Sequence, residues 1–201
     1  MTDAAVPAPP EDLRRAKAAA RTAARRLRAG LDPAGAGERL AACFAAAFPA
    51  LPAGAVVAGY WPLRDEIDVR PLLHHVTRTG GRPALPVMQG PGLPLRFRAW
   101  APGQALRPGP FGVQEPGPEA PELVPSLVLV PLLAFDRTGM RLGYGAGFYD
   151  RTLALLRAGG PVTAVGIGHA AQEVPAVPHD GLDQPLDWVV TDRDAIRIGK
   201  D

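Results

Sequence analysis

The chain has 201 residues, of which 47% are hydrophobic and 21% are charged, and its formal net charge at pH 7 is +2. This length allows one domain with a buried core, and the near-neutral charge argues against a nucleic-acid-binding protein. We expect a single α/β domain over residues 11–201 behind a disordered, Pro- and Ala-rich tail at residues 1–10. No stretch resembles a transmembrane span or a signal-peptide core, so we expect a cytoplasmic protein without a membrane partner.

Hydrophobic periodicity and turn residues predict helices that alternate with strands. Helices are expected over residues 11–29, 34–48 and 68–78, and again from Thr152 to Arg157. Strands are expected at residues 55–60, 82–87, 95–100, 127–135, 161–168 and 186–191, with a surface loop over residues 101–125. Those at residues 55–60, 127–135 and 161–168 are expected to be buried. This order predicts an α/β fold with a largely parallel sheet, in which ligands bind at the carboxyl ends of the strands.

Several residue types exclude common kinds of chemistry. The only cysteine, Cys43, lies in an alanine-rich helical stretch and is interpreted as a buried structural thiol, since it has no partner for an internal disulfide. The single serine, Ser126, is not part of a nucleophile-elbow motif. The four histidines lack the spacing of metal ligands. A serine hydrolase and a zinc site are therefore not expected.

The most informative segment is the glycine-rich run RLGYGAGFYDR at residues 141–151. Its three alternate glycines allow backbone N–H groups to approach an anion closely, and the helix that follows adds its positive N-terminal end. Arg141 and Arg151 flank the run with cations, and Asp150 could hold a metal ion against phosphates. Alternating glycines also occur in ordinary tight turns, so this pattern alone leaves phosphate binding and a structural turn as equal alternatives.

Cations on the first predicted helix are a second candidate for phosphate binding. Lys17, Arg21 and Arg25 are spaced by four residues and are therefore expected to share one face of this helix. Lys17 stands out because the chain has only two lysines. The alternative interpretation, favoured by spacing alone, is a solvated basic face.

Carboxylates cluster where the predicted strand at residues 55–60 gives way to a helix. Asp65 or Asp68 could cap this helix, which leaves Glu66 as the candidate for contacting a substrate amine or amide. Asp187, just ahead of a second apolar run, is most simply a surface turn residue. Because the loop after Tyr60 and the glycine-rich run both follow predicted strands, they could converge on one site.

The run VPLLAFDRTG at residues 130–139, continued by the glycine-rich run, resembles the signature of the 5-formyltetrahydrofolate cyclo-ligase family. Shorter segments fit in the family's order: Lys17 with Arg21, residues 60–62 with 65–68, residues 111–116 and residues 185–192. The resemblance implies a three-layer α/β/α sandwich. It also implies that ATP and Mg²⁺ are used to convert 5-formyltetrahydrofolate to 5,10-methenyltetrahydrofolate, with release of ADP and phosphate.

The same resemblance implies roles for individual residues. ATP is expected to contact Lys17, Arg21, Arg141, Leu142, Gly143, Tyr144, Gly145, Ala146, Gly147, Phe148 and Tyr149. Folate is expected to contact Trp61, Glu66, Tyr144, Gly145, Ala146, Gly147 and Phe148. Glu66, Arg141 and Tyr149 are expected to be catalytic, and Asp150 and Asp187 are expected to coordinate or orient Mg²⁺. Many family members carry arginine and lysine at the positions of Tyr144 and Ala146, so it stays open which of Arg141, Lys17 and Arg21 carries most of the phosphate contact.

Two other classes of function remain as alternatives. A non-catalytic relative could hold folate or nucleotide without turnover, although a pure binder has no need of Lys17, Glu66 and Asp150 together. A sugar-phosphate isomerase or acyltransferase could use a similar α/β scaffold and would not require ATP. In each case the expected partners are small molecules rather than nucleic acid.

Overall fold

A seven-stranded sheet organises the computed structural model, which describes residues 10–199 and so leaves nearly all of the expected tail outside its range. The strands are β1 (Val56–Ala58), β2 (Arg82–Val87), β3 (Arg96–Ala99), β6 (Leu127–Pro131), β9 (Thr163–Ile167), β10 (Trp188–Val190) and β11 (Ala195–Arg197). Their order in the sheet is β11-β10-β9-β6-β1-β2-β3. The five central strands are parallel and the two edge strands are antiparallel, which confirms the predicted largely parallel sheet.

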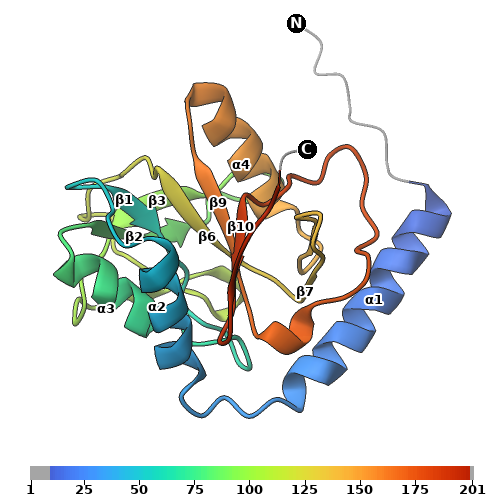
Figure 1. Cartoon of the computed structure of the whole chain (residues 1–201). Helices are drawn as coiled ribbons and strands as arrows, with labels where there is room; N and C mark the ends of the chain where they lie inside the picture. The colour runs from blue at the N-terminus through green and yellow to red at the C-terminus, as the bar shows by residue number, and fades with distance from the viewer. Residues whose placement is uncertain (1–9, 200–201) are drawn as a thin grey trace, which may run out of the picture.

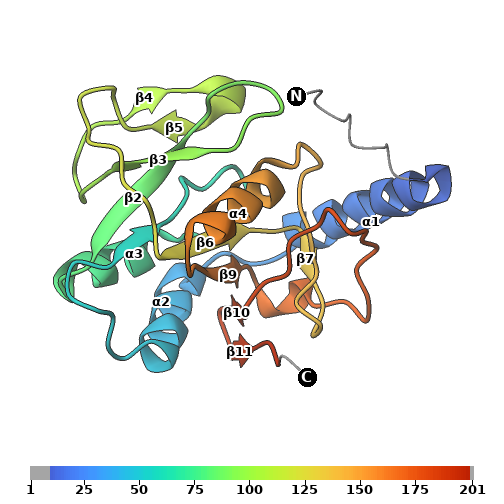
Figure 2. The same cartoon turned by 90° about the horizontal axis from the view of Figure 1, so that it is seen from above.

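Helices cover both faces of this sheet, as the predicted three-layer sandwich requires. Helices α2 (Ala36–Ala47) and α3 (Arg70–Arg78) pack on one face, and α4 (Phe148–Gly159) packs on the other (Figures 1 and 2). Helix α1 (Glu11–Ala29) lies at one side, against a small hairpin and the 3-10 turn η2 (Ala170–Gln172). The expected loop at residues 101–125 contains the short strands β4 (Arg107–Pro108) and β5 (Gln114–Glu115), joined by the 3-10 turn η1 (Pro110–Gly112).

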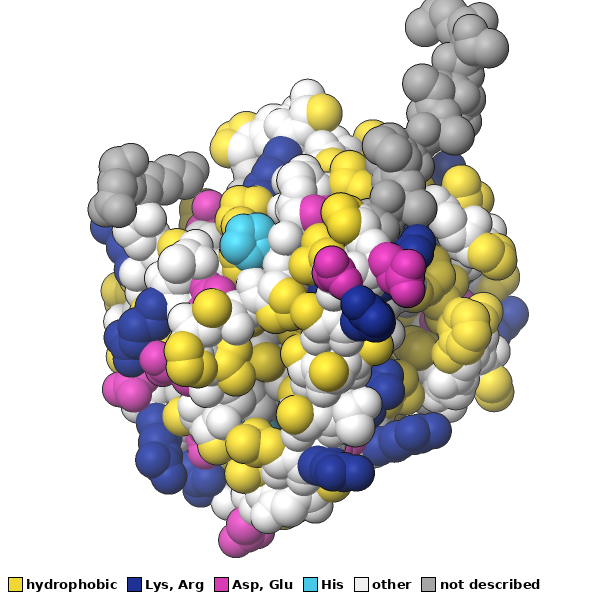
Figure 3. Space-filling model, turned by 90° about the vertical axis from the view of Figure 1, so that its right-hand side faces the viewer, with side chains coloured by type: hydrophobic (Ala, Val, Ile, Leu, Met, Phe, Trp, Pro, Cys, Tyr) yellow, Lys and Arg dark blue, Asp and Glu magenta, His cyan; other side chains and the backbone are white. Residues whose placement is uncertain are grey.

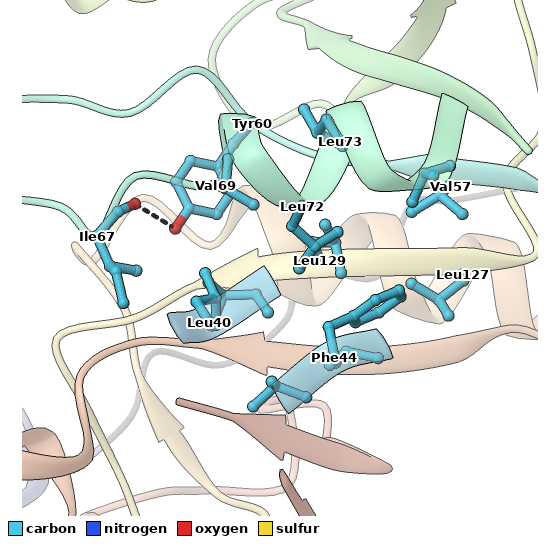
Figure 4. Close-up of a cluster of buried hydrophobic side chains, with 14 of the residues drawn as sticks. Leu40, Phe44, Val57, Tyr60, Ile67, Val69, Leu72, Leu73, Leu127 and Leu129 are labelled. Atoms are coloured by element: carbon cyan, nitrogen blue, oxygen red, sulfur yellow. Dashed lines mark hydrogen bonds between the residues drawn. The ribbon is translucent and has the colours of Figure 1, made fainter. Parts of the chain in front are cut away.

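The core explains why the central strands are apolar throughout. On β6, Leu127 and Leu129 face the helices α2 and α3, while Val128 and Val130 belong to the cluster on the α4 side. Figure 4 shows side chains of α2 and α3 packed around β6 on the first of these faces. Because side chains alternate between faces and both faces are buried, such a strand has no polar side. Cys43 is half-buried at the edge of this core, rather than buried as predicted.

The strand predicted at residues 127–135 is two separate strands. Strand β6 ends at Pro131, and β7 (Ala134–Phe135) pairs with β8 (Arg141–Leu142) in the hairpin beneath α1. Asp136, almost fully buried, holds the hairpin turn by accepting hydrogen bonds from the amides of Thr138, Met140 and Val177. The apolar run is continuous because both strands are buried, and burial alone gives no sign of the bend between them.

The sheet has a topological switch point between β1 and β6. The chain leaves β1 through α3 to reach β2 on one side, and leaves β6 through α4 to reach β9 on the other. These connections diverge from neighbouring strands, so a crevice forms at their carboxyl ends, where α/β proteins bind ligands.

Helix α4 begins at Phe148, four residues earlier than predicted, because Gly147 ends the glycine-rich run in a left-handed conformation. Gly147 has φ 68°, and a Cβ at this position would lie 2.7 Å from an Arg151 guanidinium nitrogen. Gly145, with φ 103°, is also outside the range that other residues adopt readily. The tight turn of the glycine-rich run therefore also forms the start of α4.

Replacing Gly147 by alanine should lower the free energy of unfolding by about 1–2 kcal/mol, since a Cβ adds left-handed strain and displaces Arg151. The control is Gly159→Ala in the same helix, where an added Cβ meets no atom within 4 Å. This control should be neutral or stabilising by up to about 1 kcal/mol. Urea unfolding measures the free energy of unfolding of both variants. A Gly147→Ala protein that is as stable as the native chain would contradict the described helix start.

Candidate functional site

A cleft of about 1020 Å³ opens at the carboxyl ends of β1, β2 and β6, at the switch point. Tyr60 and Trp61 follow β1, Pro86 lies near the end of β2, and Pro131 is the last residue of β6. The glycine-rich loop, the inner face of α1 and the segment 178–184 complete the walls. The predicted site residues line this cleft except Arg25 and Asp187, so the structure brings together the two strand-end loops as expected.

The glycine-rich loop is anchored by a buried ion pair. Arg141, only 7% exposed, donates to the Asp150 carboxylate over 2.6 Å and to the carbonyl of Gln184. The same Asp150 oxygen accepts from the Gln184 amide over 3.0 Å. Tyr149, which precedes Asp150 in α4, is partly buried, and burial raises the pKa of its hydroxyl well above the usual value. The loop therefore presents its backbone to the cleft from a fixed base.

Three cations of α1 line the cleft, and two of them, Lys17 and Arg21, are held there by other segments. The Lys17 ammonium lies 2.6 Å from Asp183 and 3.1 Å from Asp180, and Arg21 donates to the Gly143 carbonyl over 2.9 Å. Burial lowers the pKa of Lys17, but the hydrogen bonds and charges of the two carboxylates outweigh this effect and raise it, so Lys17 stays charged at neutral pH.

The third member of the predicted basic face is misplaced. Arg25 is exposed and does not line the cleft, whereas Arg28, which the sequence reasoning missed, is 5% exposed and points inward. A helix turns by about 100° per residue, so position 28 lies about 20° from Lys17 around the axis and position 25 about 80°. Steps of four, three and four residues from Lys17 lead to Arg28. This spacing, rather than repeated steps of four, is the sequence pattern that would have identified it.

Glu66 lies where the loop after β1 meets the glycine-rich loop. One carboxylate oxygen accepts from the Leu63 amide over 2.8 Å, and the other accepts from the Tyr144 hydroxyl. Burial raises the pKa of Glu66, and these two donors and the charge of Arg28 counteract the shift. Of its neighbours, Asp68 accepts from the first amide of α3 while Asp65 pairs with Arg28, so only Glu66 faces the cleft.

Trp61 supplies a flat apolar surface beside Glu66. Its ring packs edge-on against Trp100 at 5.9 Å between centroids, and the Arg70 guanidinium lies over it at 5.3 Å. Arg70 is itself held by a two-point ion pair with Asp68. The indole is thus fixed in orientation, which suits the stacking of a planar ligand ring.

The charges that line the cleft are balanced. The cations are Arg14, Lys17, Arg21, Arg141 and Arg151, and the carboxylates are Glu66, Glu115, Asp150, Asp180 and Asp183. An anionic ligand must therefore displace these carboxylates from the cations, or bind together with a metal ion that offsets its charge.

The two predicted metal ligands occupy different places. Asp150 lines the cleft, whereas Asp187 lies outside it and accepts from Arg157 over 3.0 Å and from the Ala164 amide over 2.8 Å. Within residues 10–199, no group of three or more His, Cys, Asp and Glu side chains could form a metal cage. Mg²⁺ commonly binds one or two carboxylates together with substrate phosphates. Asp150 fits this mode, and Asp187 is connected to it through Arg157 and Gln184.

Sequence reasoning missed most of the wall at residues 178–184. Asp180, Asp183 and Gln184 hold Lys17, Arg141 and Asp150, yet the sequence here shows only turn signals around Gly181. Figure 3 shows acidic and basic side chains next to one another on the face that carries α1. None of the helices within the described range is both long and apolar enough to span a bilayer.

Comparisons with known proteins agree with this geometry. A model of the 5-formyltetrahydrofolate cyclo-ligase family matches residues 11–192. The chain is 40% identical over 136 residues to 5-formyltetrahydrofolate cyclo-ligase of Mycolicibacterium smegmatis, covering 63% of this chain and 70% of the relative. It is 33% identical over 149 residues to the Escherichia coli K12 enzyme of the same name, covering 72% and 81%.

Solved structures extend the similarity to the fold. The structure of Aquifex aeolicus 5,10-methenyltetrahydrofolate synthetase matches with a TM-score of 0.72 at 27% identity, covering 92% of this chain and 94% of that one. The Mycoplasma pneumoniae synthetase matches in fold with a TM-score of 0.68 at 21% identity, covering 88% and 99%. The motif, the fold and these relatives agree: the chain is an enzyme of the 5-formyltetrahydrofolate cyclo-ligase family.

Proposed function

We propose that this protein uses ATP and Mg²⁺ to convert 5-formyltetrahydrofolate to 5,10-methenyltetrahydrofolate, releasing ADP and phosphate. One observation carries the proposal: a single cleft joins a cationic, glycine-rich wall to a wall that holds Trp61 and Glu66. The first wall suits phosphates and the second suits a planar, N–H-bearing ring. The reaction needs these two ligands side by side.

The chemistry explains why both walls are required. A formamide is a poor electrophile, and its oxygen is a poor leaving group. Transfer of the γ-phosphoryl group to the formyl oxygen forms a P–O bond, breaks the bond to ADP and corrects both defects. The folate N10 then attacks the activated carbon and releases its proton to solvent, and the C–O bond breaks as phosphate leaves. The protein contributes alignment and stabilisation of the negative charge that spreads during transfer.

On the phosphate side, the loop residues 143–147 offer backbone N–H groups and the positive end of α4. Lys17, Arg21 and Arg141 surround this loop, and the phosphates would take over the contacts these cations now make with Asp183, Gly143 and Asp150. The side chains of Lys17 and Asp183 are only 13% and 21% exposed, so the exchange requires that a phosphate oxygen replaces the carboxylate and leaves no buried charge without a partner.

On the folate side, Trp61 would stack on the ring, and Glu66 would accept hydrogen bonds from its N–H groups. Tyr149 retains its proton at neutral pH because burial raises its pKa, so it serves as a hydrogen-bond donor rather than a base. Asp150 would hold Mg²⁺, and Asp187 would orient this region through Arg157 and Gln184. Bound Mg²⁺ supplies positive charge at the phosphates.

The test combines protein, 5-formyltetrahydrofolate and Mg²⁺ with and without ATP, and follows the absorbance of methenyltetrahydrofolate. Product that appears only with ATP supports the proposal. Folate binding without product, measured by calorimetry in the same samples, would indicate a non-catalytic relative. Product formed at the same rate without ATP would contradict phosphoryl activation.

Lys17→Ala should raise the KM for ATP by about tenfold and change the KM for folate by less than about twofold, since one charge-assisted phosphate contact is lost. Arg25→Ala is the matched control, because Arg25 lies on the same helix and is exposed. Steady-state kinetics with each substrate varied in turn measure both variants. If both variants leave the KM for ATP unchanged, the basic helix is only a solvated face.

Asp150→Asn should raise the Mg²⁺ concentration needed for half-maximal turnover by at least about tenfold, because a hard cation loses a charged oxygen ligand. Asp187→Asn should have a smaller effect, since Asp187 does not line the cleft. Turnover is measured across a Mg²⁺ titration, with circular dichroism to confirm that each variant is folded. A folded Asp150→Asn protein with native turnover at limiting Mg²⁺ would exclude Asp150 as a ligand.

A further inference from the structure

A buried arginine outside the cleft connects three segments that form its folate side. Arg28, at the end of α1, is 5% exposed and does not line the cleft. Its guanidinium donates to the Asp65 carboxylate over 2.8 Å and to the Tyr144 hydroxyl over 2.7 Å. It also lies 5.5 Å from the centre of the Tyr144 ring. Arginine is rarely this buried unless it is paired, so its position calls for an explanation.

The hydrogen bonds in this cluster can run in only one direction. A guanidinium has donors and no acceptor, so the Tyr144 oxygen must accept from Arg28. The single hydroxyl proton of Tyr144 is then left for Glu66, to which it donates. Glu66 receives a second donor, the Leu63 amide, on its other oxygen. Arg28 therefore fixes the direction in which the Tyr144 hydroxyl donates. Tyr144 in turn fixes which carboxylate oxygen of Glu66 accepts this hydrogen bond.

Stability alone does not account for this arrangement. Burying an arginine costs desolvation, and a buried ion pair often contributes no more to stability than apolar residues of the same volume. Within residues 10–199, the Arg28 Nε atom has no hydrogen-bond partner, so the pairing is also incomplete. Buried polar networks of this kind define one geometry at the expense of stability.

We propose that Arg28 is a positioning residue for folate: through Tyr144 it holds the Glu66 carboxylate in the orientation that receives the substrate. This inference rests on the proposed folate role of Glu66. Tyr144 is 42% exposed and faces the cleft, whereas Arg28 is shielded behind it. Arg28 therefore acts on the substrate only through the two residues in front of it.

The pKa of Glu66 depends on the charged groups around it, so it gives a readout that a purely structural role of Arg28 would leave unchanged. The charged and titratable groups that act on Glu66 are Arg28, Asp65, Tyr60, Tyr144 and Tyr149. Arg28 and the Tyr144 hydroxyl favour the ionised carboxylate, while burial and Asp65 oppose it. Loss of either favourable group should raise the pKa of Glu66, so the acidic limb of a pH profile should move to higher pH.

The experiment compares Arg28→Met, Tyr144→Phe, the double variant and Glu66→Gln. Each of the first two should lower kcat/KM for 5-formyltetrahydrofolate by about tenfold. The double variant should be no worse than the poorer single one, because both changes break the same connection. Glu66→Gln should lose at least about tenfold and should also lose the acidic limb. Tyr144→Phe keeps Arg28 paired with Asp65, so it tests the proposal even if Arg28→Met folds poorly.

Arg26→Met is the control, since Arg26 is exposed on the same turn of α1 and should leave kinetics unchanged. The Glu66 titration, followed by carbon NMR in native protein and in both single variants, gives a readout that does not depend on turnover. The inference is overturned if the effects of the two changes multiply, or if the Glu66 titration does not shift. If Glu66→Gln itself retains native kcat/KM while the titration shifts, the folate role of Glu66 is wrong instead.

Discussion

The cations that surround the glycine-rich loop are already engaged by other parts of the chain, and the site depends on these contacts. Lys17 is held by Asp180 and Asp183, Arg21 by a loop carbonyl, and Arg141 by Asp150 and a carbonyl beyond it. The same groups therefore assemble the walls of the cleft. Under the proposed function, ligand binding would be an exchange of partners, in which phosphate oxygens replace carboxylate and carbonyl oxygens at charges that never face an apolar environment alone.

The sheet makes this exchange possible without loss of the fold. Its central strands are buried on both faces, and their side chains form two separate clusters under α2, α3 and α4. Of the cleft walls, Trp61 and Phe148 pack against these two clusters, whereas helix α1 packs against a small satellite cluster at the hairpin β7–β8. The phosphate side of the cleft, to which α1 contributes Lys17 and Arg21, therefore rests on fewer buried apolar contacts than the sheet does. Function at the carboxyl ends of β1 and β6 follows from the divergence of their connections.

Much of this architecture follows from sequence patterns, and the exceptions have physical causes. Continuous apolar runs located the central strands because burial on both faces removes polar positions. The break after Pro131 was missed because β6 and β7 are equally buried. Strand β11 was missed because three residues with one large apolar side chain carry no periodicity.

Within the site, the sequence identified residues whose role depends on local backbone geometry and missed residues whose role depends on partners far along the chain. The glycine-rich loop was recognisable because its geometry requires glycine at Gly145 and Gly147. Arg28 and Asp183 were missed because their importance comes from partners 116 and 166 residues away in sequence. The metal and substrate roles of Asp150, Asp187 and Glu66 remain predictions, since contacts within the protein alone do not test them.

In the function proposed here, phosphoryl transfer to the formyl oxygen is the central chemical step. It is tested most directly by running the reaction with 5-formyltetrahydrofolate labelled with ¹⁸O in the formyl group and analysing the released phosphate by mass spectrometry. Each inorganic phosphate should carry the formyl oxygen, because the P–O bond formed in activation is retained when the C–O bond breaks. Label recovered in water, with unlabelled phosphate, would contradict activation of the formyl oxygen by ATP.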